Sequence, residues 1–129
     1  MGRGNNAETT SARHQNVVVL TGTVTHEPTR RTLPAGSDVV NFDLTTRVDD
    51  HSISVPIAWY DPADSAARSF TLGDQVVVIG TVRRRFFRTA GATQSRTEVV
   101  VDSLMPTRRA KSARSLMAAA AASIMPAGE

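Results

Sequence analysis

The sequence contains no cysteine, which excludes a disulfide framework, a thiolate metal site and a cysteine nucleophile. Aromatic residues make up only 5% of the 129 residues, so few rings are available for a core or for stacking against a ligand. No apolar run approaches the roughly 18 residues of a membrane-spanning helix, and no charged and then apolar segment opens the chain. These absences predict a soluble, cytoplasmic protein.

Recognisable catalytic patterns are lacking as well. His14, His26 and His51 are scattered, no glycine-rich phosphate loop precedes a helix, and the carboxylates form no pair at a readable spacing. Acidic and imidazole side chains are adjacent at one place, Asp49, Asp50 and His51, and a tight turn is enough to explain these residues there. We therefore expect no enzyme activity, no metal and no cofactor.

What the sequence does have is basic charge carried almost entirely by arginine. Lys and Arg total 15 against 12 acidic residues, the net charge is +3 and the pI is about 10.5, and Lys111 is the lone lysine. The planar arginine side chain grips phosphate and stacks on rings in ways that lysine cannot. This composition favours an acidic partner such as nucleic acid.

Residue patterning predicts one all-β domain over residues 16–105. Alternating and β-branched residues predict strands at 16–25, 39–47, 52–59, 75–85 and 97–104. In the second strand, Val40, Phe42 and Leu44 should point inward. Asp61 and Pro62 are typical of the start of a short helix between the third and fourth strands.

The two ends of the chain differ from this domain. Residues 1–15 have almost no large apolar side chain and are predicted to form a flexible tail. Residues 106–129 are basic and alanine-rich, and alanine favours helix. Because isolated helices of this length are marginal in water, this helix should persist only if it docks on something.

Two glycines inside predicted strands, Gly22 and Gly80, indicate sharp bends or close backbone approach. Strongly bent strands in the order β-β-β-α-β-β predict a five-stranded OB-fold barrel. An SH3-like barrel is the competing fold, but it does not have the helix after the third strand.

The runs "NVVVLTGTVTHEPTRRTLPAGSDVVNF", "LGDQVVVIGTVRRRFF" and "RTEVVVDSL" resemble the bacterial single-stranded DNA-binding protein family over residues 16–104. The resemblance implies an OB-fold that coats single-stranded DNA and assembles as a homo-oligomer, a tetramer or a dimer. Three departures limit it. The segment between the second and third strands is shorter than is usual in the family, and aromatic residues for stacking are sparse. A basic, alanine-rich segment also stands where the family has an acidic tail that recruits repair enzymes. We therefore expect no recruitment by such a tip.

Single strands bind cationic side chains along their phosphates and stack their bases on aromatic faces. Alternation places Arg83, Arg85 and Phe87 on one outward stripe if Val82 and Phe86 turn inward. The resemblance implies base-stacking roles for Trp59 and Phe87. The predicted nucleic-acid-binding residues are Trp59, Phe87, Arg83, Arg85, Arg31, Arg88, Arg96 and Arg47.

Each of these residues has a simpler interpretation. Trp59 also continues the apolar face of the third strand, Phe86 suits packing in the core or in the loop 86–96, and 83–85 suit a solvated strand edge. The basic run 108–114 suits either phosphate contacts or a solubilising helix face.

The sequence predicts sequence-independent binding and protection of single-stranded DNA during replication, repair or recombination. The alternative is an OB-fold interaction or assembly module with weak or no DNA binding. Single-stranded RNA is a variant of the first hypothesis, because stacking and phosphate contacts do not detect the 2′-hydroxyl.

Overall fold

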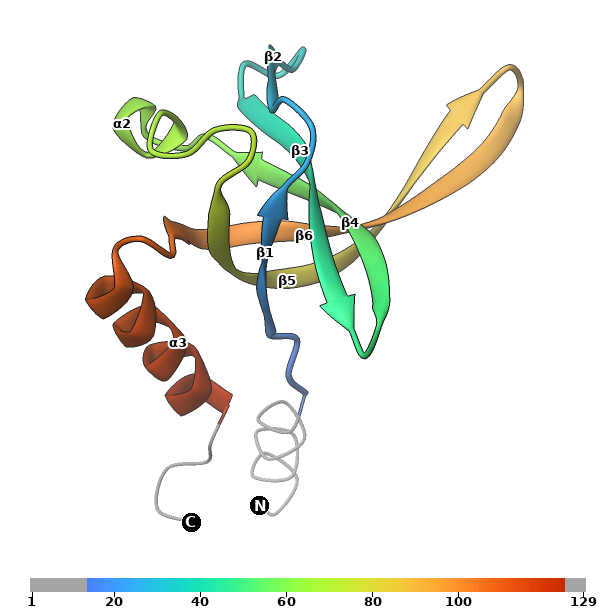
Figure 1. Ribbon diagram of the computed structural model, residues 1–129. Coiled ribbons are helices and arrows are strands. Elements are labelled where there is room, and N and C mark those ends of the chain that lie inside the picture. Colours follow the sequence, from blue (N-terminus) through green and yellow to red (C-terminus); the bar gives the residue numbers. More distant parts are fainter. Residues whose placement is uncertain (1–13, 125–129) are drawn as a thin grey trace, which may run out of the picture.

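The computed structural model describes residues 14–124, so the predicted tail at 1–15 falls almost entirely outside the described residues. The chain forms these elements in order: β1 (Val18–Val24), β2 (Thr29–Thr32), β3 (Asp38–Val48), β4 (His51–Tyr60), α2 (Asp64–Ala67), β5 (Gln75–Thr89), β6 (Ala92–Pro106) and α3 (Ala110–Ile124). Each predicted strand is present, and a short helix, α2, lies between the third and fourth of them as predicted (Figure 1). The helix begins at Asp64 with Ala63 at its N-cap, so the predicted start at Asp61 and Pro62 was wrong.

The strands close into a barrel. Their order is β1-β5-β6-β4-β3-β2, and an additional pairing of β1 with β3 closes the ring. The β4–β6 pairing is parallel, whereas β1 pairs antiparallel with both β5 and β3. The short strand β2 adds to the outside of β3. This confirms the predicted five-stranded OB-fold barrel, with β2 as an addition.

Both strand glycines lie where backbones approach closely. A Cβ atom on Gly22 would stand 2.4 Å from the Thr45 carbonyl oxygen, and one on Gly80 would stand 2.1 Å from the Val100 carbonyl oxygen. Any side chain would therefore push apart the strands at these two crossings. The two glycines are required by the curvature that closes the barrel.

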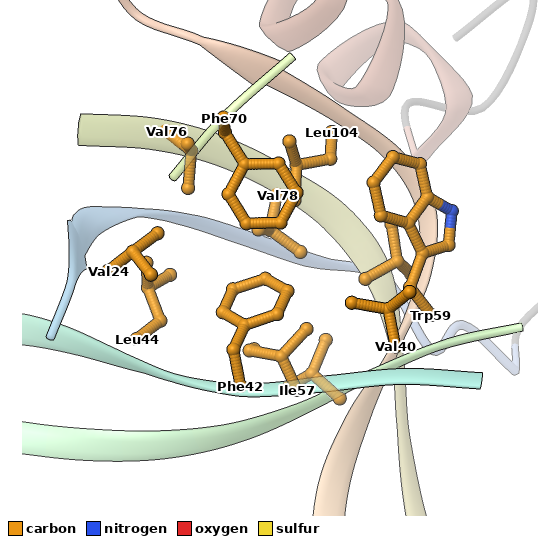
Figure 2. Close-up of a cluster of buried hydrophobic side chains, with 12 residues drawn as sticks. Val24, Val40, Phe42, Leu44, Ile57, Trp59, Phe70, Val76, Val78 and Leu104 are labelled. Carbon is orange, nitrogen blue, oxygen red and sulfur yellow. The ribbon is translucent and has the colours of Figure 1, made fainter. Parts of the chain in front are cut away.

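The barrel interior is filled by aliphatic side chains and three aromatic rings (Figure 2). Val40, Phe42 and Leu44 point inward as predicted, and each is at most 5% exposed. The Phe42 and Phe70 rings lie 5.1 Å apart between centroids, in a tilted arrangement that favours edge-to-face contact. Phe70 comes from the connection after α2, which thereby closes one end of the barrel.

The β5–β6 pair continues well beyond the barrel as a two-stranded hairpin (Figure 1). β1 pairs with β5 only as far as Gly80, and β4 pairs with β6 only at Val99 and Val100. The pairing of β5 with β6 runs on to Thr89 opposite Ala92. The prediction of a loop at 86–96 was therefore wrong. Residues 90 and 91 both have positive φ, which suits a tight two-residue hairpin turn.

Helix α3 docks against the outside of the barrel, as the alanine-rich segment requires if it is to be stable. Ala113 and Ala120 are buried against Val77 and Ile79, and Leu116 and Met117 pack at the margin of this cluster. Val77 and Ile79 alternate along β5 with the core residues Val76 and Val78, so this strand is buried on both faces. No helix in the described part of the chain is long and apolar enough to cross a membrane.

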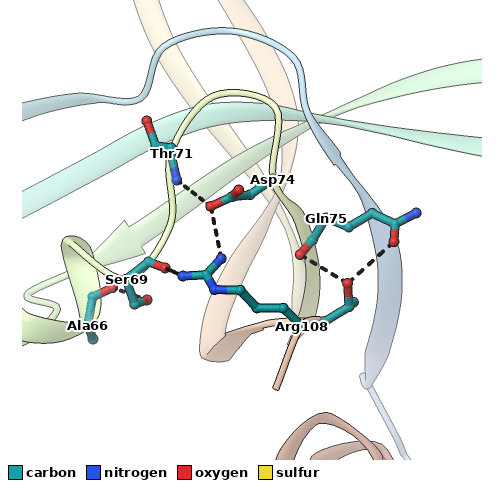
Figure 3. Close-up of polar contacts among 7 residues, drawn as sticks. Ala66, Ser69, Thr71, Asp74, Gln75 and Arg108 are labelled. Atoms are coloured by element: carbon teal, nitrogen blue, oxygen red, sulfur yellow. Dashed lines mark hydrogen bonds and ion pairs between the residues drawn. The ribbon is translucent and has the colours of Figure 1, made fainter. Parts of the chain in front are cut away.

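Arg108 fixes the start of this C-terminal segment (Figure 3). Its guanidinium donates to the Ser69 carbonyl oxygen at 2.8 Å and pairs with the Asp74 carboxylate at 3.3 Å. The same carboxylate accepts from the Thr71 backbone N–H at 3.0 Å. Arg108, from the basic run 108–114, therefore ties α3 to the connection between α2 and β5.

Candidate nucleic-acid interface

One outward-facing surface crosses β3, β4, β6 and β5, although Ala58 and Glu98 within it are only 1% and 4% exposed. The register places Asn41 of β3 opposite Ala58 of β4, and Ala58 beside Val100 of β6. On the hairpin, Arg83 lies opposite Glu98 and Arg85 lies opposite Arg96. Because residues directly opposite in an antiparallel ladder share a face, this surface runs from the barrel onto the hairpin.

A buried carboxylate organises the root of the hairpin on this surface. Glu98 is 4% exposed, and its Oε2 accepts from Arg83 at 2.7 Å and lies 3.5 Å from Arg85 Nε. The Arg83 guanidinium also donates to the Tyr60 hydroxyl and lies 5.0 Å from the centre of that ring. The hydrogen bond with Glu98, and then that with Tyr60, raise the pKa of Arg83 above its ordinary value. Glu98 and Tyr60 thus fix the position of the Arg83 guanidinium at the root of the hairpin.

Farther out, the hairpin presents an arginine and a ring together. Arg85 lies 5.3 Å from the centre of the Phe87 ring, and both side chains are half-buried. Arg83, Arg85 and Phe87 share one face, as the alternation predicts. Arg96 is exposed on the same face. These residues combine cationic groups with an aromatic ring, which is the chemistry that single strands require.

The opposite face of the hairpin corrects two predictions. Val82 is 47% exposed and Phe86 is 63% exposed, so neither is buried in the core. Val82 and Phe86 are on the same side of β5 as the core residues Val76 and Val78. At positions 82 and 86, however, β5 has left the barrel, so this side no longer faces the core. The Arg84 guanidinium lies 5.2 Å from the centre of the Phe86 ring, which gives this face its own arginine and ring pair.

Trp59 does not lie on this surface. It is 8% exposed and packs in the core, with its ring 6.2 Å from that of Phe70 (Figure 2). The core interpretation of its alternation therefore describes this structure, and the ring offers no open face to a base. The family resemblance had implied a stacking role that its burial here does not support.

The remaining predicted arginines are spread out. Arg88 is exposed near the hairpin tip and donates to the Gly91 carbonyl oxygen at 3.1 Å. Arg31 is exposed on β2 opposite Val39, whereas Arg47 lies at the far end of β3 and donates to Ser52 at 3.4 Å. Arg31 pairs with Val39, and Val39 is eight residues from Arg47 along β3. This separation is about 26 Å at the usual rise of a strand. The structure brings Arg83, Arg85, Arg96 and Phe87 onto one face of the hairpin. Alternation places Arg88 on the other face, with Arg84 and Phe86, and Arg47 lies away from the hairpin.

A polar pocket of about 290 Å³ lies beside this surface. It is bounded by the connection from β1 to β2, by β3 and by Arg96 of β6, so it borders the hairpin on one side. Besides Phe42, whose ring is in the core, the residues that line it are polar: His26, Glu27, Thr29, Asn41, Asp43 and Arg96.

Sequence reasoning missed Tyr60, Glu98 and this pocket. The residues "AG" between two alternating runs were a usable signal for the hairpin turn, and they would have paired Arg83 with Glu98. The pocket had no such signal, because its residues are brought together only by barrel closure.

The closed barrel and its polar outer surface place the chain in the OB-fold class, whose members commonly hold oligonucleotides on the equivalent strands. Comparison with known proteins narrows this class. A protein-family model, described as the single-strand binding protein family, matches residues 15–106 of this sequence. The chain belongs to this family.

Named relatives agree with this assignment. The chain is similar to the single-stranded DNA-binding protein of Paenarthrobacter nicotinovorans, with 28% identity over 113 residues covering 78% of this chain and 66% of the relative. It is also similar to the proteins of the same name from Mycolicibacterium smegmatis, with 30% identity over 111 residues, and Mycobacterium bovis, with 29% over 110. Both of these matches cover 75% of this chain and 67% of the relative. The chain thus spans about two thirds of the length of these relatives.

Proposed function

We propose that this protein binds and protects single-stranded DNA through sequence-tolerant contacts. The observation that carries the proposal is the basic hairpin, whose outer face joins Arg85, Phe87 and Arg96 to the strand surface of the barrel. The family and its named relatives support it. Exposed single strands arise during replication, repair and recombination in the cytoplasm of a bacterium, so we place its action there.

In this mechanism, arginines follow the phosphates while a base stacks on Phe87. Each phosphate contact releases counterions, so affinity should fall steeply with salt. Arg85 lies over one face of the Phe87 ring, which leaves the other face for a base. Stacking of this kind is worth about 1 to 3 kcal/mol per base.

The experiment is a titration of a fluorescein-labelled dT strand, followed by anisotropy, beside a duplex of equal length. We expect tight binding of the single strand, a steep salt dependence and much weaker binding of the duplex. Equal affinity for both DNAs, or no binding at low salt, would overturn the proposal. A parallel titration with a uridine strand decides between DNA and RNA.

We further propose a homo-oligomer, a tetramer or a dimer. Among the described residues, the first five residues of β1 pair on one side only, with β5. Val19 within this segment and Val17 just before it are exposed. An unpaired strand edge is a template for pairing with another chain. Light scattering of the pure protein should give a mass well above 13.8 kDa, and a monomer at all concentrations would exclude the oligomer.

An interaction or assembly module without DNA binding is the second candidate. The membership in the single-strand binding protein family does not favour it. The salt-dependent titration described above separates the two functions directly.

A further inference from the structure

The pocket beside the hairpin contains negatively charged residues, which is unexpected next to a surface proposed to bind phosphates. Two of its lining residues, Glu27 and Asp43, are acidic. A carboxylate repels the phosphates of a nearby strand, and this lowers the affinity for the backbone. Carboxylates are instead suited to accept hydrogen bonds from the amino groups of bases.

We infer that this pocket binds an unstacked base that carries an exocyclic amino group, and that cytosine fits it best. This inference rests on the proposed binding of single-stranded DNA. It adds a base preference to contacts that are otherwise tolerant of sequence.

The size of the pocket suits a single base. Its volume is about 290 Å³, just below the roughly 300 to 1,000 Å³ of small-molecule sites. It therefore suits one ring rather than a stacked pair.

The lining selects between the two pyrimidines of DNA. Asp43, Glu27 and the Asn41 side-chain carbonyl can accept from the N4 amino group of cytosine. Thymine presents the O4 carbonyl at that position, whose lone pairs would face the carboxylates. Arg96 supplies donors for the base carbonyl O2 or for the phosphate of the same nucleotide.

The side chains of the pocket are available for these contacts. The Asp43 side chain is 36% exposed, and its Oδ2 atom lies 3.7 Å from the Nδ1 atom of the His26 ring. The His26 side chain is 72% exposed, so its imidazole is open to stacking by a base. Asn41 and Asp43 point outward from β3 because Val40, Phe42 and Leu44 occupy the core.

The test compares labelled dC and dT strands of equal length in the wild-type protein and in Asp43→Asn. Loss of a charge strengthens phosphate binding equally for both strands, so the readout is the ratio of the two affinities. We expect the ratio of dC to dT affinity to fall about 5-fold to 150-fold, the range of discrimination by one good base contact. Asp102→Asn is the matched control, because Asp102 is an exposed β6 residue that does not line the pocket.

A ratio that changes no more in Asp43→Asn than in Asp102→Asn would overturn the pocket inference while leaving the proposed function intact. Absence of binding to either strand by the wild-type protein would overturn both. Glu27→Gln, on an exposed connection, provides a second variant with the same expected change if Asp43→Asn does not fold.

Discussion

Replacing Glu98 by glutamine should make the binding of single-stranded DNA more dependent on salt. In the folded protein the Glu98 carboxylate neutralises one positive charge of the Arg83 and Arg85 pair at the hairpin root. Glutamine keeps the shape and one acceptor oxygen but removes the negative charge. One further arginine then becomes available to a phosphate, because the Arg83 and Arg85 side chains are 41% and 37% exposed.

The size of the effect follows from counterion release. One additional phosphate contact changes the slope of log affinity against log salt by about −0.7 for single strands. Between roughly 50 and 200 mM salt, that slope change amounts to an extra loss of about 2.5-fold in affinity. Replacing a charge-assisted hydrogen bond by a neutral one should cost about 1 to 2 kcal/mol of unfolding free energy. The domain should remain folded, since such domains have about 5 to 15 kcal/mol.

Anisotropy of a labelled dT strand at four salt concentrations measures this slope, and a urea titration measures the loss of stability. Asp102→Asn removes an equal charge from another part of β6 and controls for net charge alone. An unchanged slope in Glu98→Gln, or an equal change in Asp102→Asn, would refute the idea that Glu98 withholds an arginine from the strand.

Three further predictions concern the buried Trp59 ring, the close backbone contact at Gly80 and the packing of α3 on β5. Trp59 emission should be blue-shifted and hardly quenched by a saturating dT strand, because the ring is 8% exposed; strong quenching would place it at the interface. Gly80→Ala should lower the unfolding free energy by at least about 1 to 3 kcal/mol in urea, since its Cβ would stand 2.1 Å from a carbonyl oxygen; wild-type stability would contradict the close approach. Leu116→Ala should lower the melting temperature without changing dT affinity, because it packs α3 on β5; an unchanged melting temperature would mean that α3 adds no stability.

The fold was accessible from the sequence because its signals are local. Alternation in β3 placed Val40, Phe42 and Leu44 in the core, and the strand glycines Gly22 and Gly80 indicated the crossings of the closed barrel. These patterns record which side of a strand faces apolar neighbours, and in the barrel each strand has such a side.

The hairpin shows where such reasoning ends. Alternation along β5 places Phe86 on the side that faces the core, but alternation does not reveal where a strand leaves the barrel. For Trp59, the apolar alternation of β4 predicts the buried position that the structure shows, whereas the stacking role rests on the family resemblance alone. The pairing of Arg83 with Glu98 depends on the register of β5 and β6, which the turn at 90 and 91 sets. The pocket at Asn41 and Asp43 required closure of the whole barrel.

Two neighbouring rings on opposite faces of the hairpin test the central claim most directly. Phe87 lies on the face that continues onto the barrel, whereas Phe86 lies on the other face, so Phe86→Ala is the matched control for Phe87→Ala. We predict that Phe87→Ala weakens the binding of a dT strand by about 1 to 3 kcal/mol and that Phe86→Ala weakens it less. If Phe86→Ala has the larger effect, the strand follows the other face of the hairpin. If neither variant changes the affinity, the hairpin is not the binding surface.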